Sequence, residues 1–146
     1  MHLGTALTVN FIDADGIFRG GAILPGIGMS ARALHEFTDA LPLIPMRELE
    51  EPPPAIGAET TAAMRSGLYW GAVGAMRELL TQFSHGLAQP PEVYLTGGAA
   101  PHVAAHLAPQ ARLIPELILG AIAVVGVGNR DSGVGKAARE SRGPAD

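Results

Sequence analysis

Apolar and polar residues alternate near the start of the chain. Leu7, Val9 and Phe11 are separated by polar residues. A polar cluster with the sequence DADG follows at residues 13–16, and a second apolar segment covers residues 17–24. Two such segments joined by a short polar turn are the pattern of a β-hairpin. We therefore predict that the two segments pair as antiparallel strands.

Glycine and proline interrupt the pattern after this hairpin. Pro25, Gly26 and Gly28 mark a break, and we predict that a helix follows from about Ser30 to Phe37. The next apolar piece, residues 41–49, contains two prolines. Because proline cannot donate a ladder hydrogen bond, this piece is compatible only with a strand at the edge of a sheet. We predict an edge strand there.

The longest predicted element is a helix over residues 60–83. Apolar residues recur there at steps of three and four, which is typical of an amphipathic helix. These residues are Met64, Leu68, Ala72, Met76, Leu79 and Phe83. Gly67, Gly71 and Gly74 share another face, and each costs roughly 0.5 to 1 kcal/mol relative to alanine in a helix interior. We expect a close contact on this glycine face, made either by the chain's own sheet or helices or by a second subunit.

A further strand, glycine turn and helix follow the long helix. We predict a strand over residues 93–95, a turn at Thr96–Gly98 and a helix over residues 101–107. Residues 115–128 begin with proline, which suits the first turn of a helix, and are almost entirely apolar. An apolar run of about 13 residues is too short to span a bilayer, so we expect a buried helix. The glycine-rich, charged residues 129–146 are predicted to be disordered.

Composition and charge narrow the classes of protein. With 146 residues, 47% of them hydrophobic, the chain is long enough for one domain with its own core. A net charge of −4 and ten scattered lysines and arginines argue against nucleic acid as a partner. The absence of cysteine excludes disulfides and thiolate metal sites. No leader-type sequence begins the chain, so we expect a cytoplasmic protein with no membrane partner.

The remaining polar residues give little candidate chemistry. Asp13 and Asp15 form a carboxylate pair that a D-x-D-G turn explains. Tyr69 and Trp70 lie on the long helix and are interpreted as packing residues. Four histidines lack the spacing and the acidic or third histidine partner of a metal site, so we interpret them as surface residues. They are His35, His85, His102 and His106.

Four motifs stand in the order that is typical of one enzyme family. They read GTALTV, DADGIFRGGAILPG, TTAAMRSGLYWGAVGA and VYLTGG. Together they resemble the C-terminal half of type III pantothenate kinases, which phosphorylate pantothenate with ATP in the first step of coenzyme A biosynthesis. The resemblance implies an α/β fold: a ribonuclease-H-like domain of the actin and sugar-kinase (ASKHA) group, with a mixed sheet and flanking helices, over residues 1–127. A disordered tail would follow at residues 128–146. The resemblance also implies a homodimer and a monovalent cation, potassium or ammonium.

The resemblance assigns ligand contacts to the glycine-containing turns. Gly4 and Thr5 match the residues that contact ATP phosphate, within a motif that commonly reads Asp-x-Gly-Thr-Ala-x-Thr-x-Asp in the family. Gly97 and Gly98 match a turn against whose backbone the adenosine lies, and a structural turn without a ligand is the alternative. A third match is expected to form a phosphate-side turn, or alternatively a strand bulge and helix entry without a ligand. It consists of Gly20, Gly21, Pro25 and Gly26.

Three other positions bear on the substrate and the cation. Thr60 matches a threonine that contacts pantothenate, often across the dimer interface, and by its residue type it is also a candidate N-cap of the long helix. His2 and Asn10 stand where the family has the two aspartates of its first motif. Alkali ions prefer hard oxygen ligands, so the imidazole at residue 2 is a poor replacement in a cation site.

The catalytic residues of the family have no match in this sequence. The first phosphate loop, Asp-x-Gly-Asn-Thr, and the catalytic aspartate, in Gly-Ala-Asp-Arg, lie in the family's N-terminal lobe, and the chain contains neither motif. We expect a kinase fragment that is inactive alone, because of a truncated gene, a late start or a separate chain that supplies the other lobe. The alternative is a non-catalytic nucleotide-binding or dimerisation module descended from such a kinase.

Overall fold

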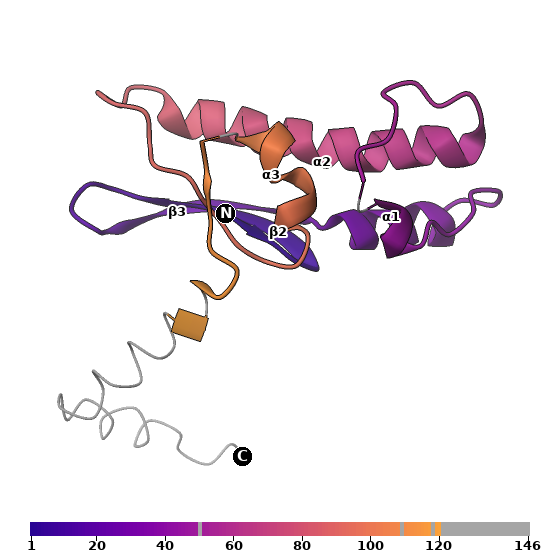
Figure 1. Ribbon diagram of the computed structural model, residues 1–146, viewed down its shortest axis with the longest axis horizontal. Helices are drawn as coiled ribbons and strands as arrows, with labels where there is room; N and C mark the ends of the chain where they lie inside the picture. Colours follow the sequence, from indigo (N-terminus) through magenta and orange to yellow (C-terminus); the bar gives the residue numbers. More distant parts are fainter. Residues whose placement is uncertain (50, 109, 118, 121–146) are drawn as a thin grey trace, which may run out of the picture. The chain divides into compact units, whose positions relative to one another are not determined.

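A computed structural model describes residues 1–49, 51–108, 110–117 and 119–120 of the chain (Figure 1). The chain divides into two units, Met1–Pro115 and Glu116–Asp146. All the strands and helices described below belong to the first unit. Most of the predicted apolar helix after residue 115, and the whole predicted tail, lie outside the described residues.

The predicted hairpin is confirmed. It consists of β2 (Ala6–Ile12) and β3 (Phe18–Pro25), which pair antiparallel. The short β1 (His2–Leu3) pairs antiparallel with the other edge of β2, so the strand order is β1-β2-β3. Ala6 lies opposite Pro25, which places the start of β2 beside the end of β3.

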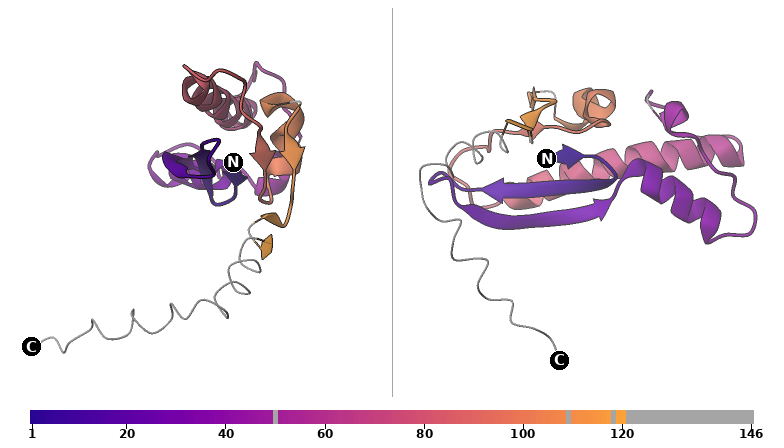
Figure 2. Two further views of the ribbon diagram at one scale, coloured as in Figure 1. Left: turned by 90° about the vertical axis from the view of Figure 1, so that its left-hand side faces the viewer. Right: turned by 90° about the horizontal axis from the view of Figure 1, so that it is seen from below.

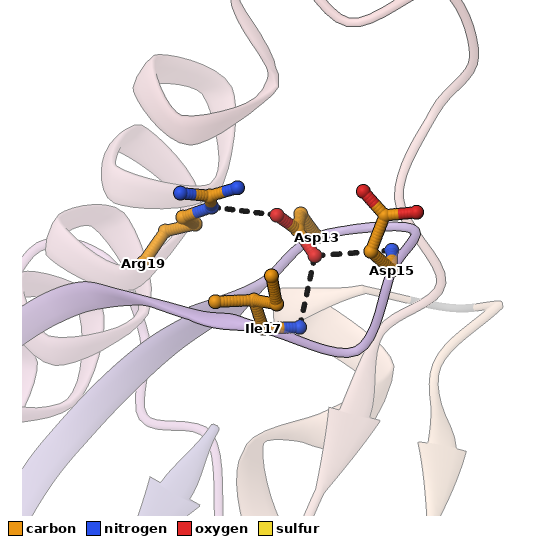
Figure 3. Close-up of polar contacts among 4 residues, drawn as sticks. All are labelled: Asp13, Asp15, Ile17 and Arg19. Atoms are coloured by element: carbon orange, nitrogen blue, oxygen red, sulfur yellow. Dashed lines mark hydrogen bonds and ion pairs between the residues drawn. The ribbon is translucent and has the colours of Figure 1, made fainter.

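Asp13 holds the turn of this hairpin, as the polar cluster predicts (Figure 3). One carboxylate oxygen accepts hydrogen bonds from the backbone N–H groups of Asp15, at 3.0 Å, and Ile17, at 2.9 Å. The other oxygen accepts one from Arg19 Nε at 2.6 Å. The Ile17 N–H bond and then the Arg19 bond lower the pKa of Asp13 below its usual value. These bonds account for the Asp13 carboxylate as a structural group of the turn.

A second pair of strands continues the sheet on the other side of β1. β4 (Tyr94–Leu95) and β5 (Arg112–Leu113) pair in parallel. A parallel bridge between His2 and Thr96 joins β1 to the end of β4. The Leu3 N–H donates to the Thr96 carbonyl oxygen at 2.8 Å, and β4 and β5 lie beside β1 (Figure 2). The structure is therefore of the predicted α/β class, with an antiparallel sheet to which a parallel strand pair is bridged.

The three predicted helices are present, but the segment between the first two differs from the prediction. α1 (Ile27–Glu36) begins three residues earlier than predicted. α2 (Thr60–Ser84) and α3 (Ala100–Leu107) match their predicted ranges to within one residue. The edge strand predicted over residues 41–49 is wrong: residues 41–45 form no regular structure, and the last four form the 3₁₀ turn η1 (Met46–Leu49). The two prolines lack the N–H groups that a strand would use.

The core lies between the sheet and α2, which runs along the β2–β3 hairpin (Figure 1). Alternation along β2 buries Leu7 and Val9, and Tyr69 and Met76 of α2 are buried in the same core. Full burial of an apolar side chain of this size stabilises a fold by roughly 1.5 to 3 kcal/mol. Tyr69 is completely buried, so the sequence-based interpretation of this aromatic residue as packing is confirmed.

The glycine face of α2 has no neighbour among the described residues. A Cβ atom built on Gly67, Gly71 or Gly74 would meet no described atom within 4 Å. Contact with the chain's own sheet or helices, the first of the two predicted alternatives, is therefore wrong for this part of the chain. In the described ranges no helix combines the length and the apolar character that crossing a bilayer would require.

Candidate functional site

The Gly4–Thr5 turn connects β1 to β2. The Gly4 N–H donates to the Ala6 carbonyl oxygen at 3.1 Å, which closes the turn tightly. Thr5 is exposed, so its hydroxyl is available to a ligand. The backbone carbonyl oxygen of Thr5 instead faces the protein and accepts the Gly26 N–H at 2.9 Å. The turn is thus fixed by its backbone and leaves its one hydroxyl free for binding.

Gly26 lies directly against this turn. A Cβ atom at Gly26 would overlap the carbonyl oxygens of Gly4 and Thr5, so any other residue would push the two segments apart. Gly26 is also the N-cap of α1, with an extended backbone and no side chain to cap the first N–H groups. The first turn of α1 contains no acidic residue. Its free N–H groups and the helix dipole therefore give this point a partial positive charge, which favours an anion.

The turn at Thr96–Gly98 approaches the same region from β4. The Ala99 N–H donates to the Leu3 carbonyl oxygen at 3.1 Å, so the turn is bonded to the residue before Gly4. Gly97 has a φ of +98°, and a Cβ atom there would overlap the Leu3 backbone. Gly98 is exposed, and a Cβ atom there would meet nothing within 4 Å. The fold therefore requires glycine at position 97, whereas at position 98 it leaves room for a side chain.

A shallow hollow opens beside these turns. It is lined by residues near the starts of α1 and α3 and by residues of η1. Its lining is mainly apolar, with buried side chains at its base and one imidazole residue. The lining residues are Ile27, Met46, Leu49, Gly98, Ala99 and His102.

Gly20 and Gly21 do not belong to this cluster. Residues 20–25 do not form a turn, because they belong to the strand β3, and contact of this segment with phosphate stays a prediction. Gly20 lies opposite Phe11, beside a register shift in the hairpin, which matches the alternative of a strand bulge. At the rise of a strand, Gly20 is about 17 Å along β3 from Pro25. Only Pro25 and Gly26 therefore lie beside the Gly4–Thr5 turn.

Thr60 is the first residue of α2 and is exposed. The N-cap is Glu59, which makes no side-chain capping bond, so the prediction of Thr60 as N-cap is wrong by one position. The segment before the helix folds back onto α2. Ser66 Oγ donates to the Ala55 carbonyl oxygen at 2.7 Å, and Trp70 Nε1 donates to the Pro53 carbonyl oxygen at 2.9 Å. Thr60 does not line the hollow at Gly98.

The residues present do not fit an alkali cation beside the first turn. His2 Nδ1 is buried and has no hydrogen-bond partner among the described residues, and its Nε2 lies against Gly4. An imidazole presents nitrogen, whereas potassium and similar ions take hard oxygen ligands. Asn10 is exposed and lies on β2 opposite Gly21, toward the far end of the hairpin. Within the described ranges, no three histidine, aspartate, glutamate or cysteine side chains come together as a metal site.

Of the residues around the hollow, the sequence analysis proposed only Gly98 as a site residue. Met46 and Leu49 were placed in an edge strand, and the 3₁₀ turn that brings them to the hollow has no periodic signal. His102 was interpreted as a surface histidine. The signal that could have found it is its position two residues into the helix that follows the Gly97–Gly98 turn.

Comparison with known proteins agrees with the motifs. The family model described as type III pantothenate kinase matches residues 1–82. A type III pantothenate kinase from Dinoroseobacter shibae is 41% identical over 101 residues, and one from Cereibacter sphaeroides is 42% identical over the same length; each match covers 69% of this chain and 38% of the relative. One from Anaeromyxobacter is 41% identical over 104 residues, which cover 71% of this chain and 40% of the relative. The matches thus span about two fifths of the length of these curated relatives. The chain belongs to the type III pantothenate kinase family.

Proposed function

We propose that this chain forms the nucleotide-binding part of an ATP-dependent kinase that phosphorylates pantothenate in the first step of coenzyme A biosynthesis. One observation carries the proposal: the Gly4–Thr5 turn, Gly26 and the Gly97–Gly98 turn come together from three separate parts of the chain. Each of these segments matches a family motif. Their convergence at the N-terminus of α1 supports a site for the phosphates of ATP.

The chemistry of this site is electrostatic positioning. Thr5 would donate its hydroxyl to a phosphate oxygen, and the first N–H groups of α1 would neutralise part of the phosphate charge. Phosphoryl transfer depends mainly on such positioning and charge stabilisation. The strand order β3-β2-β1-β4-β5 across the bridged sheets supports our proposal of a ribonuclease-H-like domain of the ASKHA group over residues 1–127. Residues 128–146 remain a proposed disordered tail.

The helix α2 carries the residues that we assign to pantothenate binding and to dimerisation. Thr60, exposed at the start of α2, is the residue that we assign to pantothenate. The open glycine face of the same helix supports a homodimer built on α2. The family resemblance implies that Thr60 contacts pantothenate across such a dimer interface.

The catalytic carboxylate must come from outside these 146 residues, because neither motif of the family's N-terminal lobe is among them. We propose that the chain alone does not phosphorylate pantothenate, and that a lobe with the two missing motifs completes the site. A non-catalytic module is the second candidate, and His2 in place of the motif's first aspartate favours it. We also propose that ATP binding depends little on potassium, because His2 offers no oxygen ligand.

An ADP-release assay with pantothenate, ATP and ammonium tests this function. The chain alone should show no turnover above background, and a chain extended by a lobe that carries both motifs should show pantothenate-dependent turnover. Turnover by the chain alone would contradict our placement of the catalytic residues. An extended chain that folds and binds ATP without turnover would favour the non-catalytic module.

Ligand-observed NMR tests the nucleotide site directly. The chain alone should bind ATP with a dissociation constant no better than roughly millimolar, or about 4 kcal/mol, because an open half-site leaves the phosphates solvated. The affinity should be equal in potassium and in a large organic cation. Micromolar binding that requires potassium would contradict both statements.

A further inference from the structure

We propose that His102 is a specificity-determining residue that contacts the base of the bound nucleotide. The inference rests on the proposed function, since it concerns the far end of the same ligand. It assigns to the hollow at Gly98 the heteroaromatic part of the nucleotide, and to His102 the polar contact at its edge.

The hollow lies next to the proposed phosphate site. Ile27 lines the hollow and is the residue directly after Gly26, which lies against the Gly4–Thr5 turn. Gly98 lines it from the opposite segment and carries no side chain to fill it. A nucleotide with its phosphates at Thr5 would therefore reach the hollow with its other end.

The chemistry of the lining suits a flat heteroaromatic ring. Ile27 and Leu49 are buried and apolar, and Met46 adds a flexible thioether that adapts to a ring face. A ligand site of this kind needs few polar groups, and those groups fix orientation and specificity. Among the lining residues His102 alone has a polar side chain. Its imidazole has a donor and an acceptor in the neutral state, as a base edge requires.

His102 is held in place by its backbone, which leaves its ring available. The Tyr69 hydroxyl donates to the His102 carbonyl oxygen at 2.7 Å and so ties the first turn of α3 to the buried face of α2. Across the described ranges, no hydrogen bond, ion pair or ring contact engages the His102 imidazole. His106 differs, because its ring lies 5.1 Å from Trp70 and its Nδ1 lies 3.2 Å from the Tyr69 hydroxyl oxygen. Of the two histidines on α3, only His102 lines the hollow.

The test compares two probes, ATP and inorganic tripolyphosphate, by ligand-observed NMR on the full chain. Saturation transfer from protein methyl groups should reach the adenine protons of ATP. His102→Ala should weaken ATP binding by about fivefold, the loss of roughly one hydrogen bond, and leave tripolyphosphate binding unchanged. Gly98→Val should fill the hollow and have the same selective effect. His106→Ala, one turn further along the helix, is the matched control and should bind both probes like the unaltered chain.

The possible failures are distinct. If the unaltered chain binds ATP but His102→Ala binds it equally well, or loses both probes equally, the inference is wrong while the proposed function stands. If the unaltered chain binds neither probe, both are overturned. Circular dichroism of each variant checks folding, and Gly98→Val keeps the test decisive if His102→Ala fails to fold.

Discussion

At the scale of single residues, the neighbouring glycines 97 and 98 have different reasons to be glycine. Gly97 adopts a φ of +98° and lies against the Leu3 backbone, so the fold itself excludes a side chain. Gly98 has open space around it. From the sequence, a structural turn and a nucleotide contact were alternative roles for the two glycines. The geometry shows that the structural requirement for glycine applies to Gly97.

Alanine substitutions should separate the two glycines. Gly97→Ala should lower the free energy of unfolding by about 2 kcal/mol or more, because of the left-handed backbone and the overlap with Leu3. Gly98→Ala should change it by less than about 0.5 kcal/mol, as expected for an exposed residue with free space. Urea denaturation followed by circular dichroism measures both. Equal effects of the two substitutions would contradict this distinction.

Asp13 should make the stability of the hairpin depend on pH. Its pKa is lowered in the folded state, chiefly by the Ile17 N–H and then by Arg19. The stabilisation is therefore complete above the unfolded-state pKa of about 4 and is lost as the pH falls through the lower folded-state value. Asp13→Asn should be less stable than the unaltered chain at pH 7, and the difference should shrink below pH 4.

Denaturant titrations from pH 7 to pH 2.5 follow this difference. Asp15→Asn is the control, because Asp15 contributes its backbone N–H rather than its carboxylate to the bonds of Asp13. A constant difference between Asp13→Asn and the unaltered chain across this range would show that the Asp13 carboxylate does not titrate with folding.

At the scale of secondary-structure elements, the sequence predicted the strands and helices whose apolar residues recur in a regular pattern. Alternation identified β2, the apolar segment after the polar turn identified β3, and the three- and four-residue steps identified α2. The 3₁₀ turn η1 has no period of its own, because its position depends on packing against α1 and α2. Thr60 was expected at the cap and lies one residue inside the helix, since the choice of N-cap depends on the extended backbone of Glu59.

The glycine face of α2 gives a prediction for assembly. Gly71→Leu should leave the chain folded, since the position is open and leucine is a better helix former than glycine by about 0.5 to 1 kcal/mol. It should convert a dimer built on this face into a monomer. Light scattering measures the mass, and circular dichroism the folding. Arg77→Leu, an exposed position about a third of a turn around the same helix, should remain dimeric. A folded Gly71→Leu dimer would rule out this interface.

At the scale of the whole molecule, the site could be predicted only as separate segments. The motifs near Thr5, Gly26 and Gly98 were visible in the sequence, but their convergence depends on contacts between residues far apart. The same limit applies to two details. Gly20 and Gly21 stand close to Gly26 in sequence, yet an extended strand carries them away from it. His102 reaches the hollow only because α3 packs on α2.

The pairing of β1 also sets an order of events during synthesis and folding. β1 finds β2 only a few residues away, but its other neighbour, Thr96, comes after more than ninety intervening residues. Contacts of such different sequence separation close at different rates, because the loop entropy of the longer one must be overcome first. Pulse-labelled hydrogen exchange should therefore find the Val9 amide protected before the Leu3 amide. A ribosome adding about 5 to 20 residues per second would expose the Gly4–Thr5 turn for several seconds before its partner strand exists. Within these 146 residues, the Gly4–Thr5 turn is therefore made well before the strand beside which it finally lies.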